Sequence, residues 1–126
     1  MQAEFDGKQR EFSIDRAHIT FLEHSLGRGL YAVVKDFADG KWTFDDVATV
    51  VSFALHGPSR EERVTISAAR NAARLGMPFF PGVKYAVHPD VIAVLHRDGH
   101  GNYAGLAADI LALTIFGAKA AEATDG

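Results

Sequence analysis

The sequence contains no cysteine, which removes disulfide frameworks, thiolate zinc sites and cysteine nucleophiles from consideration. Long apolar runs are absent too: none approaches the roughly 18 residues of a membrane span. Residues 1–11 are polar and charged, without the apolar stretch of a signal peptide. We therefore expect a soluble cytoplasmic protein that does not contact a membrane.

The chain has no large excess of charge of either sign. It carries 13 Lys and Arg against 16 Asp and Glu, for a formal net charge of −3. Because phosphate binding needs a concentrated basic surface, nucleic acid is not expected as the main partner. A hydrophobic content of 48% with 23% charged residues is typical of a globular protein, and 126 residues fit one domain.

Motifs of the common enzyme classes are missing as well. The sequence has no P-loop, no dinucleotide-binding glycine fingerprint and no Gly-x-Ser-x-Gly elbow. Ser25, Ser52 and Ser67 lie in helical patterns, and none has a His and an acid at the spacing of a catalytic motif. We expect a protein that is not an enzyme and that needs no cofactor.

Helical periodicity is what the sequence does contain, and it is clearest in residues 43–55. The apolar positions of this stretch recur at the spacing of one helix face: Phe44, Val47, Ala48, Val51, Ala54 and Leu55. Thr43 can cap the first turn, Asp45 and Asp46 suit its positive end, and Gly57-Pro58 supplies a stop. This pattern predicts a central helix, covered by a helix over 30–37, by the last helix and by an N-terminal hairpin.

The remaining patterns predict the other elements. Asp6-Gly7 between short alternating runs predicts a β-hairpin over about residues 3–14. Ser59 and Glu62 form a capping box that begins a helix to Leu75, whose arginines we interpret as a solvated face. The predicted fold is mainly α: a small bundle of about five or six helices with the N-terminal hairpin, in one domain over 1–117, followed by a mobile tail over 118–126.

Residues 77–89 are the most aromatic and least regular part of the chain. Three prolines exclude a continuous helix there. The aromatic side chains could pack on the core, which is their usual place, or they could form an exposed apolar surface for a partner. The candidate partner-binding residues are Phe79, Phe80, Val83 and Tyr85.

Six histidines are the only compositional hint of a chemical site. His96 and His100 are spaced to share a helix face, but Gly99 and Gly101 make a continuous helix unlikely there. A polar turn is therefore favoured over a metal site. If a metal were bound, the candidate ligands would be His88, His96 and His100.

Several stretches together resemble the small tail proteins of gene transfer agents and related phages. They are Phe5-Asp6-Gly7-Lys8 through Phe12-Ser13-Ile14, residues 20–30, 43–48 and 53–57, and Tyr103 to Leu111 followed by Ile115-Phe116-Gly117. The likeness covers about residues 2–57 and 102–117, whereas residues 58–101 depart from the short acidic linker helix expected there.

This resemblance implies a function in building a phage-like tail. Proteins of this kind were first described as tail tube proteins and later grouped with tail assembly chaperones. The resemblance implies a chaperone that binds the tape measure protein before the tube polymerises, encoded by a gene transfer agent or a prophage. The alternatives are a tail tube subunit, which would be virion-associated instead of staying in the bacterial host cell, and a small histidine-based metal-binding protein. The resemblance implies the tape measure protein or other tail proteins as partners, and a homo-oligomer stays open.

Overall fold

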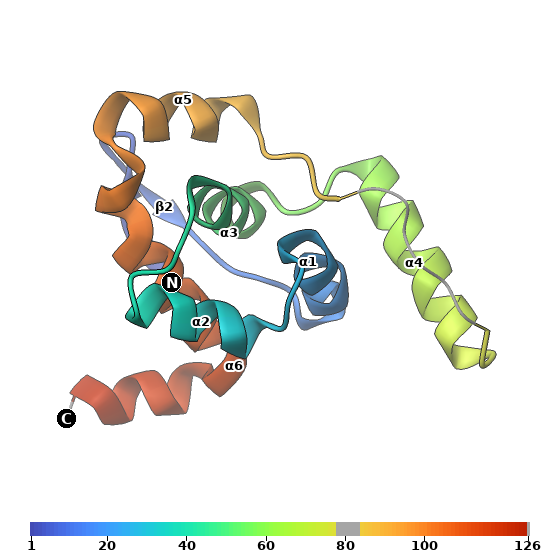
Figure 1. Ribbon diagram of the computed structural model, residues 1–126. Helices are drawn as coiled ribbons and strands as arrows, with labels where there is room; N and C mark the ends of the chain where they lie inside the picture. Colours follow the sequence, from blue (N-terminus) through green and yellow to red (C-terminus); the bar gives the residue numbers. More distant parts are fainter. Residues whose placement is uncertain (78–83, 126) are drawn as a thin grey trace.

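The computed structural model describes residues 1–77 and 84–125, with side chains described up to residue 117 (Figure 1). The fold is mainly α with an N-terminal hairpin, as the sequence predicts. Its elements are β1 (Gln2–Phe5), β2 (Lys8–Glu11), η1 (Arg16–His18), α1 (Ile19–Leu26), α2 (Leu30–Ala38), α3 (Phe44–His56), α4 (Arg60–Arg74), α5 (Pro89–Asp98), η2 (His100–Tyr103) and α6 (Ala104–Asp125). None of the described helices is both long enough and apolar enough to cross a membrane.

The hairpin forms at the predicted turn. Strands β1 and β2 pair antiparallel, with Phe5 opposite Lys8. Asp6 and Gly7 both have positive φ, 55° and 75°, which is the backbone of the tight turn that Asp-Gly favours between two strands. Phe5 and Phe12 are buried, and the Phe5 ring meets the edge of Tyr103 at 5.4 Å between centroids. The hairpin thus closes one side of the bundle.

Helix α3 lies at the centre of the bundle and contacts α1, α5 and α6 (Figure 1). The sequence predicts one buried face for this helix, but the structure buries more than one face. Val50, Ser52 and Phe53 are also buried, whereas Phe44 and Leu55 remain partly exposed. Because neighbours contact α3 from several directions, the helix is buried around its whole circumference.

The start of α3 is closed by a reciprocal capping box between Thr43 and Asp46. The Thr43 hydroxyl accepts from the Asp46 amide at 3.1 Å, and the Asp46 carboxylate accepts from the Thr43 amide at 3.0 Å. The buried Asp46 carboxylate also receives two hydrogen bonds from Arg28, at 3.1 and 2.9 Å. The sequence pattern had related Asp46 only to the helix dipole, yet its side chain completes a capping box and an ion pair.

The last helix, α6, packs against both α2 and α3. Helix α2 lies mainly against α6 rather than against α3, and α6 also contacts α3. At Gly117 the backbone leaves helical geometry, with φ 81° and ψ 172°, where the sequence predicts the end of the helix. A further helical segment continues to Asp125. The mobility of residues 118–126 stays a prediction.

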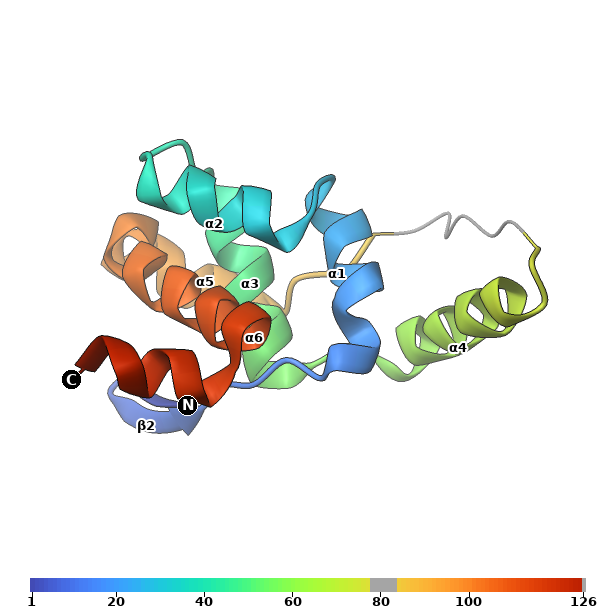
Figure 2. The same ribbon diagram turned by 90° about the horizontal axis from the view of Figure 1, so that it is seen from below.

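Helix α4 stands apart from the other elements, as Figures 1 and 2 show from two directions. It begins at the predicted capping box: the Ser59 hydroxyl accepts from the Glu62 amide at 3.2 Å, and Glu62 accepts from the Ser59 amide at 2.7 Å. Of its residues only Glu62 and Ile66 are buried. Most of this 15-residue helix therefore faces solvent.

Candidate functional site

The exposed side of α4 carries a stripe of positive charge. At roughly 100° per residue its four arginines fall within an arc of about 80°. They are Arg60, Arg63, Arg70 and Arg74, and all four are exposed. Arg63 donates to the Pro58 carbonyl at 3.3 Å, and none of the ion pairs formed within the described residues involves α4. These guanidinium groups are thus available to an acidic partner.

An apolar row runs beside the arginine stripe. Val64, Ala68, Ala72 and Leu75 follow one another at intervals of four, four and three residues, the spacing of one helix face. Val64 and Leu75 keep 67% and 68% of their surface exposed, and Met77 just beyond the helix keeps 60%. We call the arginine stripe and this apolar row together the α4 outer face. It is a helix surface of the kind that other helices pack against.

Residues 84–88, here called the strap, lead back from α4 to the bundle and are held through their backbone amides. The Tyr85 amide donates to the Ser25 hydroxyl, the Ala86 amide to the Glu62 carboxylate and the His88 amide to the Ser52 hydroxyl, each at 2.9 Å. These side chains belong to α1, α4 and α3. The strap is therefore hydrogen-bonded to three helices that are separate in the sequence.

Tyr85, a predicted partner-binding residue, lies in the core. Its ring meets the edge of Phe53 at 4.9 Å between centroids. Its hydroxyl lies 2.8 Å from the Ser52 hydroxyl and donates to the Gly57 carbonyl at 3.3 Å. Burial raises the pKa of the Tyr85 phenol. At this residue the structure has the packing alternative that the sequence favours, while Phe79, Phe80 and Val83 lie outside the described residues.

The three histidines predicted as metal ligands do not lie together. His96 stacks on Phe44 at 4.8 Å between centroids, and His100 meets the edges of Phe44 at 5.1 Å and Trp42 at 5.5 Å. His96 and His100 therefore belong to an aromatic cluster over the start of α3. His88 lies elsewhere, beside the end of that helix.

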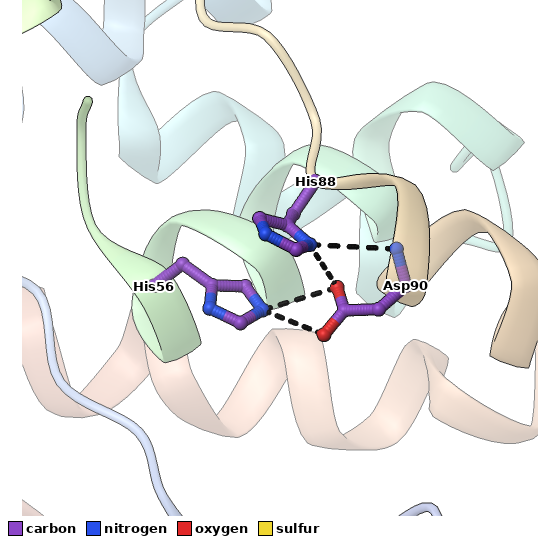
Figure 3. A group of neighbouring side chains, drawn as sticks. All are labelled: His56, His88 and Asp90. Atoms are coloured by element: carbon purple, nitrogen blue, oxygen red, sulfur yellow. Dashed lines mark hydrogen bonds and ion pairs between the residues drawn. The ribbon is translucent and has the colours of Figure 1, made fainter.

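His88 instead joins His56 and Asp90, as Figure 3 shows. His56 Nε2 lies 3.1 Å from both carboxylate oxygens of Asp90, and His88 Nδ1 lies 2.5 Å from one of them. The two imidazole rings stack at 4.1 Å between centroids. Partial burial opposes ionisation of Asp90, but the hydrogen bond to His88 and the two imidazoles lower the pKa of this carboxyl overall.

Sequence reasoning missed two members of this cluster. His56 ends α3 and Asp90 lies in the first turn of α5, 34 positions further on. The one local signal that could have found part of the cluster is the pair His88 and Asp90 on either side of Pro89. Spacing motifs such as the one joining His96 and His100 cannot detect a cluster that the fold assembles from two distant helix ends.

Comparison with known proteins connects the chain to phage tails. The model of a family described as "Phage tail tube protein, GTA-gp10" matches residues 1–80. The match includes the hairpin, α1 to α4 and the whole α4 outer face. It extends through residues 58–80, which we had expected to depart from the family, and it does not include the last helix, where we had seen a likeness. No curated protein and no solved structure matches the chain.

Proposed function

We propose that this chain, which belongs to the family of phage tail tube proteins, GTA-gp10, is a tail assembly chaperone. In this proposal it binds the tape measure protein, keeps it available while the tube forms around it, and catalyses no reaction. Membership of a phage tail family implies interaction with other tail proteins. The observation that carries the finer proposal is the α4 outer face, which is exposed beside a folded bundle.

The physical case rests on how helices recognise one another. An apolar row at intervals of four, four and three residues presents a seam to an amphipathic helix, which contributes its own apolar side chains to the contact. The arginine stripe beside the row then faces the polar flank of the partner. Acidic residues on that flank would raise the association rate and select the register of the two helices. A tape measure segment with an apolar stripe and acidic flanks fits this surface.

The test is co-purification with the tape measure protein encoded in the same tail gene cluster. We expect the wild-type chain to co-purify with it, and the double variant Val64→Asp/Leu75→Asp to lose the interaction while keeping its helical circular dichroism. The matched control is Tyr31→Asp on α2, because Tyr31 is also an exposed large apolar residue, at 61%. Two results would count against the proposal: undiminished binding by the double variant, or no binding by the wild type when both proteins stay in solution.

A tail tube subunit is the second candidate, and the description of the family as tail tube proteins favours it. Copies of a tube subunit contact one another and remain in the finished particle, whereas an assembly chaperone leaves. Mass spectrometry of purified particles separates the two functions. Abundance comparable to that of other structural proteins would support the tube subunit, and absence would support the chaperone.

A further inference from the structure

We propose that His56, His88 and Asp90 form a binding site for one divalent transition-metal ion of the zinc class. The site lies where α3 ends and α5 begins (Figure 3). This inference is independent of the tail-assembly function and concerns a different surface from the α4 outer face. It replaces the ligand set expected from the sequence, since only His88 is common to both.

The three residues lie close enough to share a single ion once the two imidazole rings, which stack with an interplanar angle of 23°, turn their nitrogens towards a common point. One ligand atom from each residue can be chosen so that all three lie within 4.8 Å of one another. Ligands held at about 2.0 Å from a tetrahedral zinc ion are about 3.3 Å apart. The separation of 3.1 Å between His56 Nε2 and the Asp90 carboxylate is close to that value, whereas the 2.5 Å between His88 Nδ1 and Asp90 is shorter and has to lengthen when an ion enters.

The donor set selects the class of ion. Two imidazole nitrogens with one carboxylate suit zinc, cobalt, nickel or ferrous iron, whereas magnesium and calcium prefer sites made of oxygen alone. The three side chains are 25%, 50% and 47% exposed, so the remaining coordination positions are open to water. An ion would take the place of a proton in the contacts of His56 and His88 with the Asp90 carboxylate, and it would displace the capping bond that His88 Nδ1 accepts from the Asp90 amide at 3.4 Å.

The backbone on which the ligands stand is well supported. The His88 amide donates to the buried Ser52 hydroxyl, which places this residue against α3. Pro89 occupies the first turn of α5 and restricts the backbone between His88 and Asp90. His56 is the last residue of α3, directly before Gly57 with φ 70°. Ligands held on such elements lose little freedom when an ion binds.

The position of the cluster gives the ion a structural consequence. The chain leaves the bundle after His56, forms α4, and comes back along the strap, which packs on the bundle from Tyr85 and ends at His88. An ion held by these two histidines and Asp90 would link the end of α3 to the start of α5, and so join the two ends of the segment that contains α4. Because it binds the folded arrangement of two distant helix ends, it would raise the stability of the fold in proportion to its occupancy.

The experiment uses the full chain purified without a histidine tag. Added Zn²⁺ should raise the melting temperature by about 5 °C or more at saturation, with Mg²⁺ causing no shift. Elemental analysis after dialysis should give one zinc ion per chain. Bound Co²⁺ should show the visible absorption bands of a site with nitrogen and oxygen ligands, which non-specific adsorption does not produce.

Single variants then test the ligands. His56→Gln and Asp90→Asn keep the size of each side chain and should weaken Zn²⁺ binding by more than about 100-fold. His96→Gln and His100→Gln are the matched controls and should bind as the wild type does. Circular dichroism verifies that each variant is folded. Failure of the wild type to bind, or equal losses in the His56 and His100 variants, would overturn the proposal in favour of a purely hydrogen-bonded cluster or adventitious surface binding.

Discussion

Helices α3 and α4 begin in the same way and end in opposite environments. Both start with a reciprocal capping box, Thr43 with Asp46 in one and Ser59 with Glu62 in the other, and they have 13 and 15 residues. Yet α3 is buried around its circumference, whereas α4 buries only Glu62 and Ile66. A cap thus determines where a helix begins, because it satisfies local amides, and leaves open what the helix contacts.

The side chains after the cap explain the difference. From Val47 to Leu55 no charged residue interrupts α3, so burial on every side carries no cost of an unpaired charge. Helix α4 instead carries four arginines along one side and small or apolar residues along another. Val64 and Leu75 of its apolar row keep about two thirds of their surface exposed, which is why we relate this row to a partner and relate α3 to the fold.

The largest effect is expected from placing a charge on each helix in turn. Val51→Asp buries an unpaired carboxylate at a fully enclosed position and should lower the free energy of unfolding by more than about 4 kcal/mol. Val64→Asp, the same change on the α4 outer face, should alter it by no more than about 0.5 kcal/mol. Chemical denaturation followed by circular dichroism measures both. A large loss in the Val64 variant would mean that α4 is covered in solution.

A smaller effect is expected from removing one hydroxyl. Ser52→Ala deprives the His88 amide of its acceptor and the Tyr85 hydroxyl of one partner inside the core, and should lower the free energy of unfolding by about 1 to 3 kcal/mol. Ser67→Ala on exposed α4 is the control and should be nearly neutral. If the two variants unfold alike, the strap is not held through Ser52.

Removing either cap should cost a similar amount of stability, but the loss should affect different parts of the molecule. Thr43→Ala and Ser59→Ala should each cost about 1 kcal/mol of helix stability. In α3 this loss should appear in the global free energy of unfolding, because the helix is part of the core. In α4 it should appear as faster amide hydrogen exchange within residues 60–74 alone. Uniform loss of protection in both variants would show that α4 unfolds only together with the bundle.

The smallest effect is a pH dependence confined to the bundle. Hydrogen bonds from Arg97 and then Tyr103 lower the pKa of Asp98 to about 2 from an ordinary 3.8. The folded state therefore keeps this carboxylate ionised where the unfolded chain protonates it. The resulting stability is present above about pH 3.8 and is lost as the pH falls towards about 2.

Denaturation curves across that interval test this for the wild type and for Asp98→Asn. The variant should lose part of the acid sensitivity, while hydrogen exchange in α4 should respond to acid equally in both proteins. An unchanged pH dependence in the variant would show that the contacts of Asp98 do not persist in solution.

Much of the local structure follows from the sequence because its causes are local. Asp6-Gly7 supplied the hairpin turn, Thr43 and Ser59 the caps, and Gly117 the break in the last helix, each through the conformational preference of one or two residues. Hydrophobic spacing likewise located α3, although it could not show how many neighbours would surround it. The candidate metal site could not be predicted from the sequence in the same way, because His56 and Asp90 come together only in the folded chain.

The sequence by itself determined the helical class, the hairpin and the points at which most elements begin and end, because capping and turn preferences act over three or four residues. Only the tertiary structure decided that α3 is enclosed while α4 projects, that Tyr85 belongs to the core, and that His88 lies with His56 and Asp90 rather than with His96 and His100. Those outcomes depend on which distant segments pack together. The total of the contacts over the whole chain determines that packing, and no single stretch of the sequence contains the information.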